Sequence, residues 1–76
     1  MKTYFKSIVG DVYMMLDDDK KQVVLCSSFS NVKNIDILTS ESNYNRYVTE
    51  SQNSTKWYTS DEASYLVVQN DVIDSL

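Results

Sequence analysis

Short apolar runs separated by polar turns fill the first half of the chain. The runs "TYFKSIV", "DVYMML" and "KQVVLCSS" are rich in β-branched and aromatic residues, which is typical of strands in hairpins. We expect three antiparallel strands at residues 3–9, 11–16 and 21–28. The alternation of apolar and polar residues in "NIDIL" indicates a fourth strand at 34–38. The first half therefore predicts a β-meander of three to four strands.

The turns between these strands predict which side chains share a face. The first turn falls at Val9-Gly10 and places Phe5 beside Met14. The second turn falls in the Asp triplet and, centred on Asp18-Asp19, places Met14 opposite Val23. Because side chains alternate along a strand, one face carries Val12, Met14, Leu16, Val23 and Leu25, and the other carries Tyr13, Met15, Val24 and Cys26. Both faces of the hairpin are therefore apolar.

The second half of the chain has helical periodicity in two places. In "SESNYNRYVTES", Tyr44, Tyr47 and Val48 recur at the spacing of one helix face, which predicts a helix at 41–51 after a Ser or Thr cap. The stretch "TSDEASYLVVQNDVIDSL" predicts a second helix at 60–75. Its apolar side carries Tyr65, Leu66, Val68, Val72, Ile73 and Leu76.

Two features of the second helix affect this prediction. Thr59 and Glu62 have the spacing of a capping box, and the carboxylates of Asp61 and Glu62 fall in the first turn, where the helix dipole favours them. Val67 breaks the apolar stripe, and the segment "SYLVVQ" at 64–69 is also compatible with a strand.

Together these elements predict one α+β domain over residues 1–76, an antiparallel meander followed by two helices packed on one sheet face. Two short helices cover one face of a small sheet. We therefore expect the second face, which carries Tyr13, to be open or to meet a partner.

The composition narrows the chemistry that the chain offers. The chain has no His, one Cys and a formal net charge of −4. Nucleic-acid binding depends on clustered Lys and Arg, whereas the seven cations of this chain are scattered. Cys26 lies in an apolar run without a neighbouring cation, as is typical of a buried, unreactive thiol. We expect no catalysis, no cofactor and no direct nucleic-acid contact.

The chain also carries no signal for a membrane. No apolar run is long enough to cross a bilayer or to form the core of a signal peptide. A single Cys cannot form an internal disulfide, which agrees with a reducing compartment. We expect a cytoplasmic protein without membrane contact.

The stretch "LDDDKK" raises the question of a metal site. A calcium loop spreads its oxygen ligands over a long loop with a Gly at the bend, and this stretch has neither the length nor the Gly. Asp is favoured in turns because its side chain bonds the backbone two residues on. We interpret Asp17, Asp18 and Asp19 as a turn and expect no metal.

Aromatic residues indicate the surface that meets a partner. Six Tyr and one Trp are many for a core of this size, and both residue types are enriched at protein interfaces. Trp57 either packs on the following helix as a hydrophobic staple or faces a partner. The partner-binding residues that we predict are Tyr4, Tyr13, Met15, Val24, Trp57 and Tyr58. The function predicted is that of a non-catalytic module, such as a small phage-type accessory or inhibitor protein, which binds a host protein or a second copy of itself.

A second hypothesis rests on the acidic residues. The stretch "YTSDEASYLVVQND" resembles a region near the end of the phage-encoded uracil-DNA glycosylase inhibitors, and the pairs Glu41-Ser42 and Glu50-Ser51 resemble the Glu-Ser pair of that family. The resemblance covers under a quarter of the chain and implies a small acidic αβ protein that mimics DNA. Such a mimic would inhibit a DNA-binding or defence enzyme, for example uracil-DNA glycosylase or a CRISPR or restriction component. Its phosphate surrogates would be Asp17, Asp18, Asp19, Glu41, Glu50, Asp61 and Glu62.

Overall fold

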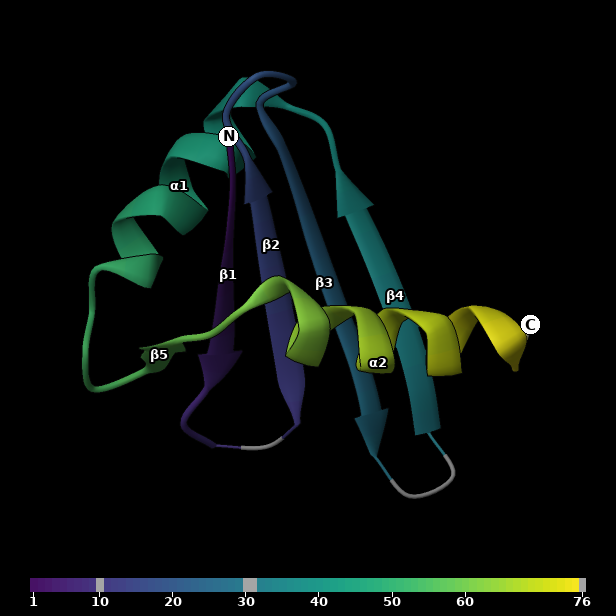
Figure 1. The fold of residues 1–76 in the computed structure, drawn as a ribbon. Helices are drawn as coiled ribbons and strands as arrows, with labels where there is room; N and C mark the ends of the chain where they lie inside the picture. The colour runs from purple at the N-terminus through teal and green to yellow at the C-terminus, as the bar shows by residue number, and fades with distance from the viewer. Residues whose placement is uncertain (10, 30–31, 76) are drawn as a thin grey trace.

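The computed structural model describes residues 1–9, 11–29 and 32–75 of the chain. Over these residues it has the strands β1 (Lys2–Ser7), β2 (Val12–Asp17), β3 (Gln22–Phe29), β4 (Val32–Leu38) and β5 (Trp57–Thr59), and the helices α1 (Glu41–Ser51) and α2 (Glu62–Asp74) (Figure 1). The strands form one antiparallel sheet in the order β4-β3-β2-β1-β5. The predicted α+β meander with two helices packed against it is confirmed.

The two hairpins differ in how well their registers were predicted. In the first, Phe5 lies opposite Met14, as predicted; Gly10 of the predicted turn lies outside the described residues. In the second, Met14 lies opposite Leu25 and not opposite Val23. This is a shift of two residues, and it leaves every side chain on its predicted face because the side-chain period of a strand is two.

The shift of the second hairpin has a local cause. The carboxylate of Asp17 accepts hydrogen bonds from the backbone N–H groups of Asp19 and Lys20, at 3.1 and 3.3 Å. Lys21 then adopts a left-handed conformation with φ of 52°, and the loop closes at the pair of Asp17 and Gln22. The turn is thus centred one residue later than the sequence predicts.

The sequence prediction missed the strand β5, which pairs with the outer edge of β1. Ser7 lies opposite Trp57 and Phe5 opposite Thr59. A strand of three residues is too short to show the alternation by which strands are predicted. Because β5 ends at Thr59, α2 begins at Glu62, and Asp61 is its N-cap, with a side chain that accepts the N–H of Ser64 at 2.7 Å.

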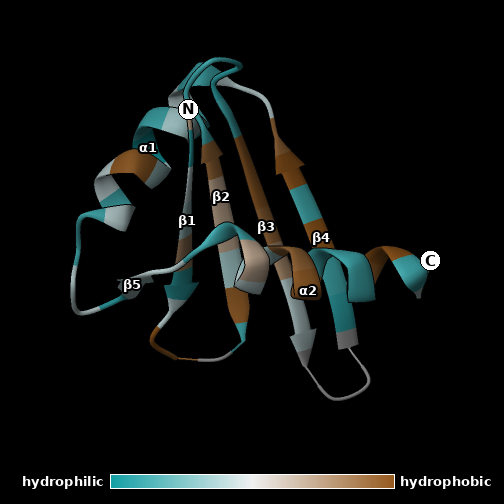
Figure 2. Ribbon diagram, in the orientation of Figure 1, coloured by the Kyte–Doolittle hydropathy of each residue, from teal (hydrophilic) through white to brown (hydrophobic). Residues whose placement is uncertain are grey.

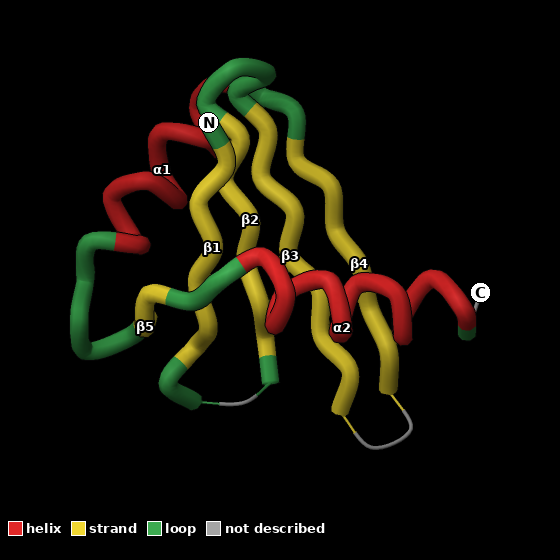
Figure 3. Tube along the Cα trace, in the orientation of Figure 1, coloured by secondary structure: helices red, strands yellow, loops and turns green. Residues whose placement is uncertain are grey.

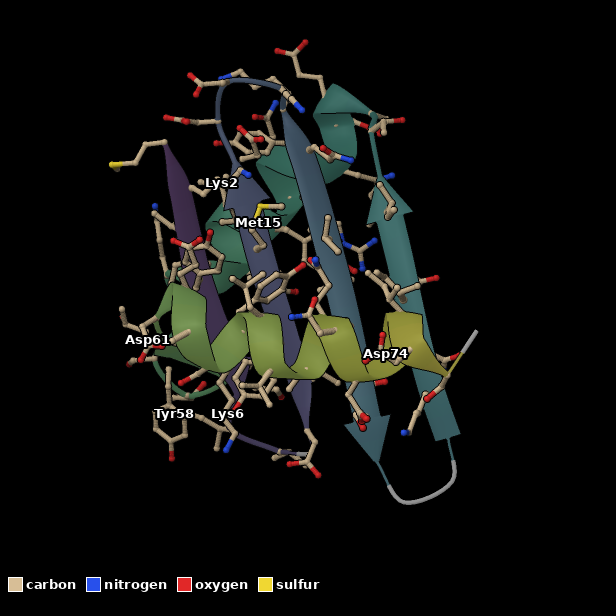
Figure 4. The ribbon with its side chains drawn as sticks, turned by 45° about the vertical axis from the view of Figure 1, so that its right-hand side comes forward. Lys2, Lys6, Met15, Tyr58, Asp61 and Asp74 are labelled. Carbon is tan, nitrogen blue, oxygen red and sulfur yellow. The ribbon has the colours of Figure 1, made fainter. Side chains whose placement is uncertain are left out.

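The prediction that both helices pack on one face of the sheet is wrong. Met14 and Met15 are adjacent on β2 and point to opposite faces, and both are buried. The α1 face of the sheet packs Met14, Leu16 and Val23 against Tyr44, with Phe5, Leu25, Leu38, Tyr47, Val48 and Trp57 around them. The α2 face packs Met15, Val24 and Cys26 against Tyr65 and Val72, with Tyr4, Tyr13, Ile35, Leu66 and Val68 around them. Figures 1 and 4 show α2 in front of the sheet and α1 behind it.

The physical reason is that both faces of the central strands are apolar. Figure 2 shows hydrophobic positions along β2, β3 and β4 and in the middle of α2. Burial of apolar surface on both faces lowers the free energy more than burial of one. β5 leads the chain along the edge of the sheet beside β1, and from there α2 crosses the face that α1 leaves uncovered (Figure 3).

α1 begins where its predicted cap places it, whereas α2 begins two residues later than predicted and is capped by Asp61 and not by Thr59. The Ser40 hydroxyl accepts the N–H of Asn43 at 3.1 Å and caps α1. The segment 64–69, compatible with helix or strand from its sequence, is helical. No helix in residues 1–9, 11–29 or 32–75 is both long and apolar enough to span a membrane.

Candidate interaction surface

Five of the six predicted partner-binding residues lie on the α2 face of the sheet: Tyr4, Tyr13, Met15, Val24 and Tyr58. Met15 and Val24 are buried beneath α2, and the rings of Tyr4 and Tyr65 lie 5.2 Å apart in a tilted arrangement. The expectation that this face is open is therefore wrong, because α2 supplies its cover. Met15 and Val24 belong to the core.

Part of the α2 face remains accessible where α2 does not reach. Lys6 lies opposite Tyr58 of β5 on one side and opposite Tyr13 of β2 on the other. Its ammonium group lies 5.8 Å from the centre of the Tyr13 ring. Tyr58 is 55% exposed and Tyr13 is half-buried. Figure 4 shows Lys6 and Tyr58 on one side of α2, and Lys2 and Met15 on the other.

A groove runs along the same side of α2. We call it the acidic groove; it has a volume of about 590 Å³. Its lining comes from the start of β2, the end of β3 and the outer flank of α2, and consists of Asp11, Tyr13, Ser28, Val67, Val68, Asn70, Asp71 and Asp74. Val67, which breaks the apolar stripe of α2 in the sequence, is 70% exposed on the rim of this groove.

The charge of the groove is held in place by hydrogen bonds. The Asp71 carboxylate accepts a hydrogen bond from the Ser28 hydroxyl and another from the Lys33 ammonium group, the latter at 3.1 Å. These two donors, the Ser28 hydroxyl first, hold the pKa of Asp71 below its ordinary value. Asp11 and Asp74 add two exposed carboxylates, and the residues that line the groove include no Lys or Arg within the described part of the chain. The groove therefore combines an aromatic ring and two valines with three carboxylates, one of which is paired with Lys33.

The two aromatic residues of β5 do not form one surface. Trp57 and Tyr58 are neighbours in a strand and point to opposite faces. Trp57 is half-buried on the α1 face and packs against the core beneath α1. The interpretation of Trp57 as a staple on the following helix is therefore wrong, because the pairing of β5 with β1 turns its side chain away from α2.

Trp57 borders a smaller cavity of about 280 Å³ between α1 and β5. Its lining residues are Ser7, Val9, Arg46, Tyr47, Glu50, Thr55, Lys56 and Trp57. Lys56 is paired with Glu50 at 3.6 Å, and the Arg46 guanidinium lies 5.6 Å from the centre of the Tyr47 ring. The cations here are thus already engaged by neighbouring side chains.

The Asp triplet forms the turn that the sequence predicts. Asp17 is buried and bonds the backbone of the turn, as described above, while Asp18 and Asp19 are exposed and both accept hydrogen bonds from the amino group of Met1. This amino group lowers the pKa of Asp18. One oxygen from each of the three carboxylates falls within 4.8 Å of the others. The hydrogen bonds of the turn bring these three carboxylates close together.

The other acidic residues lie apart from the triplet. Glu41 is in the first turn of α1, and Glu50 is in the last turn of α1. Asp61 and Glu62 lie at the start of α2. Figure 1 shows the turn between β2 and β3 and the start of α1 at one end of the molecule, whereas the start of α2 lies near β5. The seven residues therefore do not follow one line along the surface.

The only thiol of the chain lies in the core. Cys26 is buried beneath α2, and burial raises the pKa of its thiol. A thiol of this kind is mostly protonated at neutral pH and is a weak nucleophile. This environment agrees with the prediction of a structural cysteine.

Comparisons of the chain with protein-family models, with curated proteins and with solved structures find no match. The candidate site therefore rests on geometry. Among the groove residues, only Tyr13 was predicted from the sequence. Asp11, Asp71 and Asp74 were missed because the fold brings them together from separate elements, whereas the exposure of Val67 was signalled by its place outside the apolar stripe.

Proposed function

We propose that this protein is a non-catalytic interaction module that binds a partner protein through the acidic groove. The observation that carries the proposal is the composition of this groove: the Tyr13 ring and the exposed Val67 lie in the same depression as three carboxylates. Apolar surface supplies binding free energy, and complementary charge supplies specificity and fast association. The chemistry that fits is an extended or helical segment with apolar side chains flanked by Lys or Arg.

Two features support the groove as a prepared site. Ser28 and Lys33 hold the Asp71 carboxylate at the groove in a defined position, and Asp11 and Asp74 provide exposed carboxylates for the cations of a partner. Val67 is not part of the core beneath α2. Because it is an exposed apolar residue, a partner that covers it removes apolar surface from water and gains binding free energy.

The acidic residues of the second hypothesis are less favourable as a DNA mimic. They lie in separate places, and Asp18, Asp19 and Glu50 are paired with cations of the chain itself. A mimic of a nucleic-acid backbone needs evenly spaced and available charge. The acidic groove is therefore the surface that we propose.

The test uses a display library of random peptides, selected on the immobilised protein. We expect selected peptides to carry Lys or Arg beside apolar residues, and to bind less tightly as salt is raised. Val67→Lys places a cation and a long side chain on the rim of the groove and should lower the affinity for these peptides by at least about tenfold.

The matched control is Ile37→Lys, which adds the same charge on the α2 face but outside the groove. It should bind the selected peptides as the wild type does. Peptides that bind Val67→Lys as tightly as the wild type, or a selection that enriches nothing over the bare support, would contradict the proposal.

A further inference from the structure

The outer edge of β4 is the longest unpaired edge of the sheet within the described residues. β4 has seven residues and ends the strand order on one side, whereas β5, with three residues, ends it on the other. An unpaired edge presents backbone N–H and C=O groups that a further strand can bind. α1 does not cover this edge, because it packs over β2 and β3 and toward β5 (Figure 1).

β4 has few of the features by which proteins protect such an edge. It contains no Pro, and its pairing with β3 continues without a bulge from Val32 to Leu38. Its charged residues are Lys33, whose ammonium group pairs with Asp71 on the α2 face, and Asp36, which lies on the α1 face. Ile37 lies on the α2 face near the end of the strand and is 56% exposed. The edge is therefore long, regular and partly apolar.

We propose that β4 binds β4 of a second copy of this chain in an antiparallel pair, so that one continuous sheet runs through a two-fold symmetric dimer. A second copy is the occupant that covers two exposed isoleucines at once, Ile37 of β4 and Ile73 at the end of α2. In an antiparallel pair of identical strands, side chains that face each other lie on the same sheet face, so the symmetry axis passes through one residue and its own copy.

The residue on the axis is Ile35, the middle of Val32–Leu38. This register pairs the whole strand, with Asn34 opposite Asp36 of the second copy and Lys33 opposite Ile37 of the second copy. A register centred on Asn34 pairs only residues 32–36 of the two described strands with each other. A register centred on Asp36 places two carboxylates opposite each other, which is destabilising.

The position of α2 favours the same register. Asp71 contacts Lys33, so α2 crosses β4 at the level of Lys33, and its last turn continues past the edge of the sheet (Figure 1). In the proposed dimer the residue at that level is Ile37 of the second copy. Ile73 is in this last turn and is 48% exposed. The overhanging end of α2 then covers Ile37 of the second copy, which explains why both side chains are left exposed in one chain.

Sedimentation equilibrium over a concentration series tests the dimer, and two substitutions at Ile37 test its register. The wild type should be a reversible dimer. Ile37→Lys places an ammonium group opposite Lys33 of the second copy and should raise the dissociation constant of the dimer by at least about tenfold. Ile37→Glu places a carboxylate opposite the same Lys33, and its dissociation constant should stay within about threefold of that of the wild type.

Which of the two variants dimerises more tightly is informative, because the chain already carries a net charge of −4. General repulsion between the copies would favour Ile37→Lys over Ile37→Glu, which is the reverse of the expected order. Both variants should fold as the wild type does, because the side chain is largely exposed.

Val67→Lys is the matched control on the α2 face, and it should leave the dimer unchanged. It also separates this proposal from the acidic groove, since Val67→Lys should affect only peptide binding and Ile37→Lys only the dimer. A wild type that stays monomeric at every concentration would overturn the proposal, as would equal weakening by both Ile37 variants.

Discussion

At the scale of single residues, the hydroxyl of Tyr65 is a polar group buried in the core beneath α2. Tyr65 is 1% exposed, and within the described residues its hydroxyl has no hydrogen-bond partner. Burial is the main cause that raises the pKa of this hydroxyl, with the nearby Cys26 as a smaller contribution. An unpaired buried hydroxyl costs about 1–3 kcal/mol relative to water.

The variant Tyr65→Phe removes the hydroxyl and keeps the ring that packs on Tyr4 and Met15. We expect the free energy of unfolding to stay the same or to rise by about 1 kcal/mol. Urea denaturation at neutral pH measures this, with Tyr58→Phe at an exposed position as the control. A clear loss of stability in Tyr65→Phe would mean that the hydroxyl has a partner in solution.

At the scale of elements, Asp61 caps α2 and fixes where this helix begins. The Asp61 carboxylate accepts the N–H of Ser64, and this hydrogen bond lowers the pKa of Asp61. Asp18 and Asp71 have pKa values lowered in the same direction. A carboxyl group whose pKa is lower in the folded state stabilises the fold above its ordinary pKa, and this contribution is lost as the pH falls through the folded value.

We therefore expect the stability of the protein to fall as the pH drops below about 4. Asp61→Asn keeps a good N-cap and should match the wild type at neutral pH while showing a weaker loss in acid. Asp61→Ala should lower the urea midpoint already at neutral pH. Urea midpoints measured at neutral and acid pH distinguish the two, and equal behaviour of Asn and Ala would show that Asp61 does not cap α2.

At the scale of the whole molecule, two thin cores share one sheet. α1 covers one face and α2 the other, so each helix buries a separate apolar cluster. A chain of this length buries only about 60% of the surface that its unfolded form exposes. Each of the two cores is therefore small, and the domain depends on both. Loss of either helix contact should therefore destabilise the whole domain.

Met14 and Met15 provide a matched test of this arrangement, because they are neighbours that enter different cores. We expect Met14→Ala and Met15→Ala each to lower the free energy of unfolding by about 2–5 kcal/mol. Met14→Leu and Met15→Leu keep the volume and should each cost less than about 1.5 kcal/mol. If α2 left its face open, Met15→Ala would have little effect in urea denaturation, and that result would contradict the structure.

Much of the sheet was predictable from the sequence because strand patterns are local. The alternation around Met14 and Met15 assigned each side chain to its face, and Ser40 marked the start of the first helix. The groove was not predictable, because Asp11 and Asp71 are far apart in the chain and meet only through the packing of α2 on β3. The register of the second hairpin depended on the side chain of Asp17, which no hydrophobic pattern reports.

By itself the sequence determined the strands of the meander, the faces of their side chains and the extent of the first helix. These follow from periodicity and capping, which operate within a few residues. Only the tertiary structure decided that α1 and α2 lie on opposite faces. The segment 52–61 between them is mostly polar and contains β5, and its path along the edge of the sheet delivers α2 to the uncovered face. That path depends on pairing with β1, a contact between segments about fifty residues apart, and a local pattern does not encode it.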